Sequence, residues 1–322
     1  GTCSSVGHNS AAVSAVVPTS GYSIEIYGSF DVTLEALWFE HVHGGLLLAE
    51  MANTVTLLDS FIYGVLGASG VSACGGDAGK RVDILQITRL TTNQPPGVPG
   101  YNGSVVWLDI GAGVNTVRLS AVGLINGGVG VKMSAPQDEP AGLSPGRPLF
   151  LFAEDLEIDF PSSHGLWLDV GESALLTNSY IQGSLTGSGI YVGPRWNSEV
   201  QITNTRIFGH HLAGVHVAGG RRFLMNNCIV GDNSMIGVNQ TSGVVIEANV
   251  SNFQISNNQI GPVFAQQAEC NHRYGVDIVP GSSDGYIVMG NDCSGNQMGG
   301  VSDGGSAPRQ GKQVLGNLGT GR

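Results

Sequence analysis

The chain has 322 residues, of which 50 are glycine and only 12% are charged. Lys and Arg total 14 against 25 Asp and Glu, a formal net charge of −11. This balance offers no basic footprint for a phosphate backbone, which argues against a nucleic-acid partner. The longest apolar runs, such as residues 149–153, fall far short of the roughly 18 to 20 residues that a membrane-spanning helix needs, so no membrane insertion is expected.

The five cysteines are scattered along the chain and show no CxxC spacing. Neither a disulfide framework nor a thiolate metal site is therefore indicated, and Cys228 and Cys293 are expected to be free thiols. The other motifs also give no reason to expect a metal or a cofactor. His41 and His43 alternate along one stretch, but without a nearby third ligand such a pair is more often structural.

A short pattern repeats through the chain: an apolar residue, a small polar residue, Asn, and a second apolar residue three positions later. It is clearest at 176–181, 202–207, 225–230 and 255–260. It extends in both directions when other residues are allowed at the Asn position. We call the position of this Asn in each repeat the anchor, and the anchors are 36, 59, 87, 121, 155, 178, 204, 227, 257, 291 and 317. They lie about 28 residues apart on average, which indicates a repeat architecture of about eleven units.

Each unit also contains a glycine followed by an apolar, a variable and an apolar residue, as in residues 165–168, 189–192 and 214–217. This alternation is typical of a short strand with one buried face. Coils of such variable length, with insertions confined to turns, favour a right-handed parallel β-helix over a left-handed hexapeptide helix.

The repeat resembles that of the pectate-lyase-like superfamily of parallel β-helix proteins, with Asn in the tight turn and the Gly-led strand in the first sheet. The segments 292–305 and 313–317 are similar to the terminal coils of bacteriophage tailspikes and other virion spikes. The resemblance implies an all-β, right-handed parallel β-helix solenoid that assembles as a homotrimer. We expect residues 1–21 to form an N-terminal lead-in and residues 22–322 to form the β-helix domain.

Equivalent residues of stacked coils form stripes, because neighbouring strands lie about 4.8 Å apart. The variable position of the Gly-led strand points outward, and it predicts one stripe on the surface. Its members are Trp107, Lys132, Trp167, Tyr191, His216, Asn239, Asp277 and Ser302. Rings beside carboxylates and amides suit sugars, which present C–H faces and hydroxyl edges. The alternative is that a long turn or a neighbouring subunit covers the rings.

The phrase Trp-Leu-Asp occurs twice, at 107–109 and 167–169, and puts Asp109 and Asp169 on the same outward face. Inverting glycosidases hold two carboxyl groups roughly 6.5 to 9.5 Å apart. Stacking two coils apart gives backbones about 10 Å apart, so Asp109 and Asp169 are the predicted catalytic pair if the chain is a hydrolase. Glu269 and Asp277 form a second, weaker pair, and a solvated surface carboxylate is the alternative for each of them.

Three insertions, at 91–104, 134–148 and 261–274, lengthen the turns of otherwise short coils. The first two are expected to form walls beside the outward stripe. Gly209-His210-His211 resembles a polygalacturonase motif. The paired aspartates and the Arg-Ile-Lys segment of that family are absent, so its catalytic roles are not carried over.

Three functions remain open at this point. The first is a tailspike-like virion protein that binds a host-surface polysaccharide, with or without cleaving it. The second is a structural virion spike without enzymatic activity, whose stripe is buried in a homotrimer. The third is a polysaccharide lyase or epimerase, whose usual motifs are missing. The expected partners are the host polysaccharide, other virion proteins and two further copies of the chain, and the expected location is the virion surface.

Overall fold

The computed structural model describes residues 21–67, 69–75, 80–95, 103–135, 147–264, 269–305 and 311–319. Within these ranges the chain consists of strands and turns, and it contains no α-helix. No helix in this part of the chain has the length and hydropathy needed to cross a bilayer. The expected all-β class is therefore confirmed over the described residues, whereas the lead-in segment lies almost entirely outside them.

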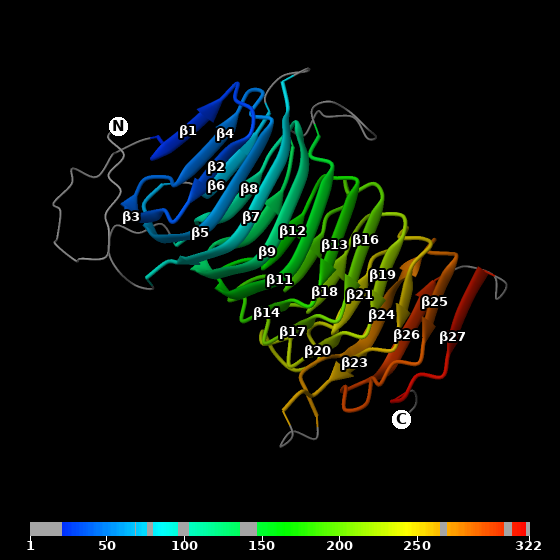
Figure 1. Cartoon of the computed structure of the whole chain (residues 1–322). Helices are drawn as coiled ribbons and strands as arrows, with labels where there is room; N and C mark the ends of the chain where they lie inside the picture. The colour runs from blue at the N-terminus through cyan, green and yellow to red at the C-terminus, as the bar shows by residue number, and fades with distance from the viewer. Residues whose placement is uncertain are drawn as a thin grey trace.

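The first sheet, sheet A, has eleven strands, and every neighbouring pair is parallel (Figure 1). In spatial order its strands are β1 (Ile24–Tyr27), β4 (Leu46–Ala49), β6 (Ser69–Cys74), β8 (Val106–Ile110), β10 (Val129–Met133), β12 (Leu166–Leu168), β15 (Ile190–Val192), β18 (Val215–Val217), β21 (Val244–Ile246), β24 (Tyr274–Gly281) and β26 (Gly299–Gly305).

The second sheet, sheet B, has sixteen strands, of which eleven form the main path. These are β2 (Val32–Glu35), β5 (Thr54–Val65), β7 (Val82–Asn93), β9 (Val114–Gly127), β11 (Phe150–Pro161), β13 (Ser173–Thr177), β16 (Glu199–Thr203), β19 (Phe223–Asn226), β22 (Gln254–Ser256), β25 (Tyr286–Met289) and β27 (Lys312–Leu315). The other five continue the coils beyond the tight turn: β3 (Trp38–Val42), β14 (Tyr180–Gln182), β17 (Arg206–Phe208), β20 (Ile229–Gly231) and β23 (Gln259–Gly261).

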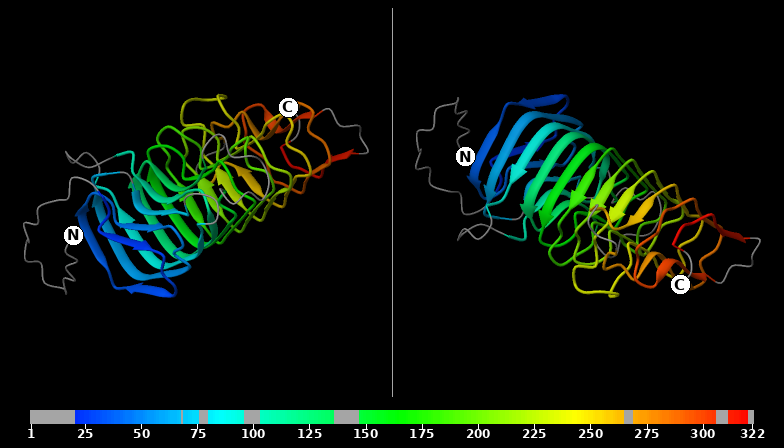
Figure 2. Two further views of the ribbon diagram at one scale, coloured as in Figure 1. Left: turned by 90° about the horizontal axis from the view of Figure 1, so that it is seen from above. Right: turned by 90° about the horizontal axis from the view of Figure 1, so that it is seen from below.

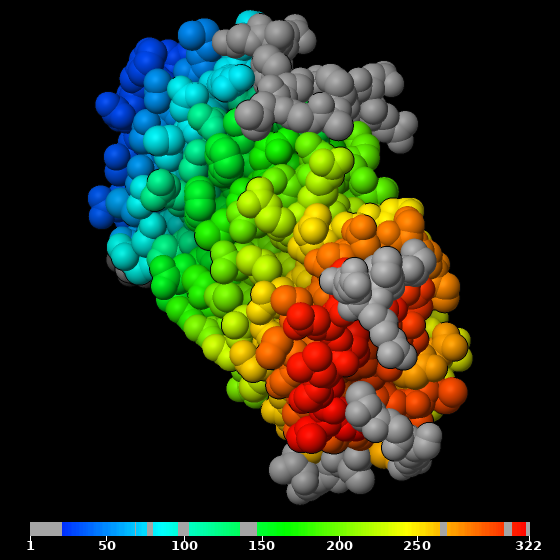
Figure 3. Space-filling model, turned by 90° about the vertical axis from the view of Figure 1, so that its right-hand side faces the viewer, coloured from blue at the N-terminus to red at the C-terminus, as the bar shows by residue number. Residues whose placement is uncertain are grey.

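The chain passes from sheet A to sheet B and back in each coil, so the two sheets wind into a solenoid with its ends far apart (Figure 2). The eleven strands of sheet A describe about ten full turns, close to the eleven units expected. Figure 3 shows the solenoid obliquely, from the N-terminal coils at the upper left to the C-terminal coils at the lower right.

Stacked aliphatic side chains fill the interior. In β13 and β16, Leu176 lies opposite Ile202, and both side chains are buried. The same alternation of inward and outward residues runs through the other strands, and the inward residues form one continuous core cluster. Because each coil alone buries little apolar surface, stacking supplies the hydrophobic stabilisation of the whole solenoid.

The repeat anchors lie in the tight turn of sheet B and adopt the left-handed backbone conformation. Eight expected positions have φ between 48° and 56°: Ala36, Asp59, Ala121, Asp155, Asn178, Asn204, Asn227 and Asn257. Three anchors are wrong. Arg89 takes the place of Ile87, because Ile87 is a fully buried strand residue. Gly290 and Gly316 precede Asn291 and Asn317, since glycine adopts positive φ at the lowest cost.

The residue after each anchor points inward and receives a hydrogen bond from the backbone of the preceding coil in several turns. Ser179 Oγ accepts from Leu156 N at 3.1 Å, and Asn258 Oδ1 accepts from Cys228 N at 2.8 Å. Buried polar groups of this kind need partners, and stacking of like turns provides them. The anchor therefore adopts the left-handed conformation of the turn, and the residue after it accepts hydrogen bonds from backbone N–H groups of the preceding coil.

Candidate functional site

The outward stripe on sheet A is present in its central part. Lys132 pairs with Asp109 on one side and with Trp167 on the other. Trp167 then lies opposite Tyr191, and Tyr191 lies opposite His216. Four of the residues singled out from the sequence, Lys132, Trp167, Tyr191 and His216, thus stand in successive coils of one column.

Beyond His216 the column continues through Val245 to Asp277 and Ser302. The expectation for Asn239 is wrong, because Asn239 lies in an exposed turn before β21, with a φ of 62°. Its backbone N–H donates to Asn271 O at 3.0 Å. The glycine that precedes the strand of this coil is Gly243, and β21 begins at Val244, so Val245 occupies the outward position.

The expectation for Trp107 is also wrong: its side chain is only 1% exposed and belongs to the core. Val71 and Val131 both pair with Leu108, so Trp107 stands in the column that glycine fills in the neighbouring coils, at Gly70 and Gly130. A Cβ at Gly70 would lie 2.8 Å from the Trp107 ring. The indole fills the space that these glycines leave, and its Nε1 donates to Asn126 O.

Four rings form the centre of the site, and we call His164, Trp167, Tyr191 and His216 the ring cluster. The His164 ring stacks on Tyr191 with centroids 4.9 Å apart and meets Trp167 edge-on at 5.4 Å. Tyr191 meets His216 edge-on at 5.3 Å. The rings are half-buried, so the ring cluster is a continuous, partly solvated aromatic surface across coils of sheet A.

Charged groups border the ring cluster at both ends. Lys132 Nζ lies 5.2 Å from the centroid of the Trp167 ring, a cation–π contact. At the other end His216 Nε2 lies 2.9 Å from Glu247 Oε1. Asp277, one column position beyond Val245, accepts a hydrogen bond from Ser242 Oγ at 3.2 Å. The site therefore combines flat apolar faces with donors and acceptors.

The two aspartates of the predicted catalytic pair have different surroundings. Asp109 is in the column itself, beside Lys132, and burial raises the pKa of its carboxyl group although the Lys132 charge opposes this. Asp169 follows β12 and forms an ion pair with Arg195, whose Nη2 also donates to Ala135 O at 3.0 Å. The two carboxylates are two coils and two residues apart in register, so their backbones are about 12 Å apart rather than the expected 10 Å.

Burial shifts the titration of two rings in the cluster. The pKa of His164 is lowered to about 4, because burial disfavours the charged imidazolium, so the ring is neutral near pH 7. The pKa of Tyr191 is raised, first by burial and then by the nearby charges of Asp169 and Glu247. The Trp167 Nε1 atom is buried and has no hydrogen-bond acceptor within the described residues.

Sequence reasoning missed three members of this site. His164 directly precedes Gly165 and so lies outside the Gly-apolar-X-apolar pattern, although a ring just before a Gly-led strand is near the outward column. Glu247 directly follows β21, and Arg195 lies in the turn after β15. Their pairing with His216 and Asp169 depends on turn geometry, which the repeat alone does not predict.

The other motifs have structural surroundings. His210 is fully buried, and its Nε2 lies 3.1 Å from Ile181 O. Gln297 Nε2 donates to Glu269 Oε2 at 3.4 Å. About half of the three insertions, at 96–102, 136–146 and 265–268, lies outside the described residues, so the expectation that the first two wall the stripe stays a prediction. Among the residues that the structure describes, no three His, Cys, Asp or Glu side chains are grouped as a metal site.

Comparison with known proteins agrees with this architecture. Residues 151–308 match the family model described as the right handed beta helix region. The chain is a right-handed parallel β-solenoid. The matched range is the part in which the Asn repeat is most regular. No curated protein matches the sequence.

Solved structures with the same architecture include tailspike protein 2 of the Escherichia coli O157:H7 bacteriophage CAB120. The identity is 11% and the TM-score 0.50, over 83% of this chain and 36% of the tailspike. The A-module of the Azotobacter vinelandii mannuronan C-5 epimerase AlgE4 matches with 14% identity and a TM-score of 0.46, over 92% and 91% of the two chains. At 11% identity the likeness to the tailspike shows the fold alone.

Proposed function

We propose that this chain is the β-helical part of a tailspike-like virion protein that attaches to a host cell by binding a surface polysaccharide. The observation that supports this most is the ring cluster, with Lys132 and Glu247 at its ends. Aromatic faces pack on the C–H faces of sugars, and the flanking polar groups bond the hydroxyls. A column along the solenoid axis matches a linear polymer, since successive coils repeat the same surface.

A screen of the purified chain against bacterial capsular polysaccharides and lipopolysaccharides tests the proposal. We expect at least one polysaccharide to bind, and the double variant Trp167→Ala, Tyr191→Ala to lose that binding. Trp38→Ala is the matched control, because Trp38 is also a surface tryptophan but belongs to β3 of sheet B. Equal binding by the double variant would place the polysaccharide elsewhere.

A second candidate function is hydrolysis of the bound polysaccharide, and the raised pKa of Asp109 is the observation in its favour. A carboxyl group that stays protonated at higher pH suits a general acid, with Asp169 as the remaining member of the pair. Release of reducing ends from the polysaccharide found in the screen measures this activity. Asp109→Asn would abolish it with binding retained. Binding without release in the wild type would make the chain a binding protein only.

We further propose that the chain assembles as a homotrimer on the virion surface, outside the host cell, where it contacts other virion proteins. Open ends of a β-solenoid expose unpaired strand edges that must be covered, and assembly is one way to cover them. Light scattering of the purified chain would give three times the mass of one chain. A stable monomer at micromolar concentration would contradict the homotrimer.

A further inference from the structure

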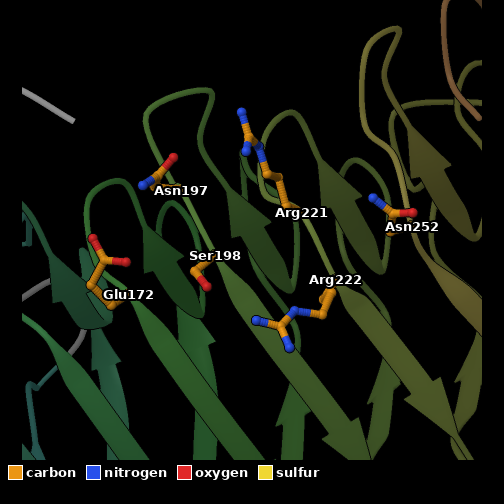
Figure 4. Close-up of a pocket in the computed structure, with 6 residues that line it drawn as sticks. All are labelled: Glu172, Asn197, Ser198, Arg221, Arg222 and Asn252. Atoms are coloured by element: carbon orange, nitrogen blue, oxygen red, sulfur yellow. The ribbon is translucent and has the colours of Figure 1, made fainter. Parts of the chain in front are cut away.

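A polar pocket of about 510 Å³ lies where the turns that leave sheet A enter sheet B. Its lining comes from four successive coils (Figure 4): Glu172, Asn197, Ser198, Arg221, Arg222 and Asn252. The same coils carry much of the ring cluster on sheet A, since Glu172 follows Trp167 by five residues and Asn197 follows Tyr191 by six. The pocket is thus around one corner of the solenoid from the ring cluster, and its size suits a small ligand or one unit of a polymer.

Two adjacent arginines dominate the charge of this pocket. Both Arg221 and Arg222 are exposed. Within the described ranges the ion pairs of Lys and Arg involve Lys80, Arg89, Arg195 and Lys312, and neither pocket arginine forms one. Two guanidinium groups without carboxylate partners, on a chain of net charge −11, mark a local site for an anion.

The turn that carries the arginines is held tightly against the coil before it. Arg221 N–H donates to Ser198 O at 3.0 Å, and Arg222 O accepts from Val200 N at 3.0 Å. Gly219 allows the close approach, because a Cβ there would overlap Gly193 O. Arg222 has a φ of 139°, which a residue with a side chain rarely adopts. Such strain is most often found at binding sites, where the surrounding structure holds it.

The opposite part of the pocket supplies hydrogen-bonding groups. Glu172 Oε1 is buried and has no partner among the described residues. Glu172 also lines the pocket, where its carboxylate can accept a hydrogen bond from a ligand hydroxyl. Asn197, Asn252 and Ser198 add amide and hydroxyl groups that both donate and accept. In Figure 4 Arg222 extends toward the coil of Ser198, whereas the side chain of Arg221 points away from it. The Arg222 guanidinium and the Ser198 hydroxyl therefore face the same space.

A ligand that satisfies both halves has one anionic group and several hydroxyls. We propose that this pocket binds the carboxylate-bearing unit of an acidic sugar, with the carboxylate on Arg222, Arg221 adding positive charge at the rim, and the sugar hydroxyls on Ser198, Glu172 and the amides. That this sugar unit belongs to a polymer rests on the proposed function. The polysaccharide that binds the ring cluster is then an acidic one.

The test uses glucuronate, glucose and inorganic phosphate as probes of the full chain, followed by ligand-observed NMR. We expect glucuronate to bind the wild type, glucose to bind at least tenfold more weakly, and the double variant Arg221→Gln, Arg222→Gln to lose at least tenfold in glucuronate affinity. Arg206→Gln is the matched control, since Arg206 is exposed on β17 outside the pocket, and it should bind as the wild type does.

A second variant guards against loss of folding. Arg222→Gly removes one guanidinium and suits the φ of 139°, so it should keep or raise the melting temperature and still weaken glucuronate binding. Unchanged glucuronate affinity in both variants would overturn the inference. Binding of phosphate in place of glucuronate would also overturn it, since the site would then be one for phosphate groups.

The outcomes separate this inference from the proposed function. Trp167→Ala should retain glucuronate binding in the pocket. If polysaccharides bind the wild type and the arginine variants equally, the acidic-sugar pocket is wrong and the proposed function stands. If glucuronate binds through the arginines but no polysaccharide in the screen binds, the proposed function is contradicted and the pocket stands.

Discussion

Asn258 donates from its side-chain amide to Oδ1 of Asn291 at 2.9 Å, and its backbone N–H donates to the same oxygen at 3.0 Å. Asn291 repeats both bonds to Asn317 one coil further on, at 2.9 and 3.1 Å. Each amide also donates to a backbone carbonyl, as Asn291 does to Ile255 O. All three side chains are buried or nearly so. This asparagine ladder fixes the spacing of the last three tight turns.

Asn291→Ala should destabilise the chain by about 2 to 3 kcal/mol, because it leaves buried donors and acceptors in both neighbouring coils without partners. The denaturation midpoint in urea measures the loss. Gln313→Ala removes an exposed amide from β27 and should change the midpoint little. An equal effect of both substitutions would show that the ladder contributes nothing specific.

Trp107→Ala should lower stability and leave ligand binding unchanged. Its indole is part of the core, and loss of a buried tryptophan costs about 3 to 5 kcal/mol. The melting temperature and the affinity for the polysaccharide from the screen are measured on the same preparation. A loss of affinity with unchanged melting temperature would restore Trp107 to the binding surface and contradict the register described here.

Trp107, which the sequence predicts on the surface and which lies in the core, shows how far the sequence predicts this fold and its site. The apolar alternation and the Asn anchors indicate the solenoid, the parallel sheets and most turns, since these depend on local backbone preference and on period-two burial. The repeated Trp-Leu-Asp tripeptide, at 107–109 and 167–169, is misleading. Because the coils differ in length, identical tripeptides occupy different columns of sheet A. Likewise residues 237–240 match the Gly-apolar-X-apolar pattern, but the glycine that precedes the strand β21 is Gly243.

The site is less predictable than the fold because it depends on groups from turns. Lys132, Trp167, Tyr191 and His216 follow from the column alone. Arg195 reaches Asp169 from the next coil, and nothing local in the sequence indicates that contact. The pocket with Arg221 and Arg222 depends on a turn conformation at positive φ that a non-glycine residue rarely adopts. Sequence patterning therefore predicts what strands present, and only the structure brings the turn residues together.

Stability should fall as the pH falls below about 6.5, because buried histidines are neutral in the folded chain. Burial lowers the pKa of His210 to about 3 and that of His272 to about 4, against 6.5 for an ordinary histidine. Since the folded pKa values lie below the unfolded ones, their contribution is complete above about pH 6.5 and is lost progressively as the pH drops toward 4.

Urea midpoints between about pH 7.5 and 4.5 measure this dependence. His272→Gln should flatten the curve, because the group that must be protonated on unfolding is gone. His41→Gln is the control, since His41 is a half-exposed side chain beside Glu40. A slope unchanged in His272→Gln would show that acid destabilisation comes from other groups.

The buried thiols should be inert in the native chain. Cys228, Cys270 and Cys293 are free and buried, as expected for Cys228 and Cys293, and burial raises their pKa to about 11, 11 and 12. The thiolate is the reactive form, so a thiol reagent at pH 8 should label these three residues only after denaturation. Peptide mapping of the native chain that recovers labelled Cys228 would contradict the packing of the tight turns.

The affinity of the polysaccharide from the screen for the wild type, Trp167→Ala and Trp38→Ala, measured by isothermal titration calorimetry, tests the central claim most directly. Loss of one large ring from a sugar contact should cost about 1 to 3 kcal/mol, or roughly 5-fold to 150-fold in affinity. We predict that loss for Trp167→Ala and an unchanged affinity for Trp38→Ala. Equal affinities for all three proteins would contradict binding along the ring cluster of sheet A.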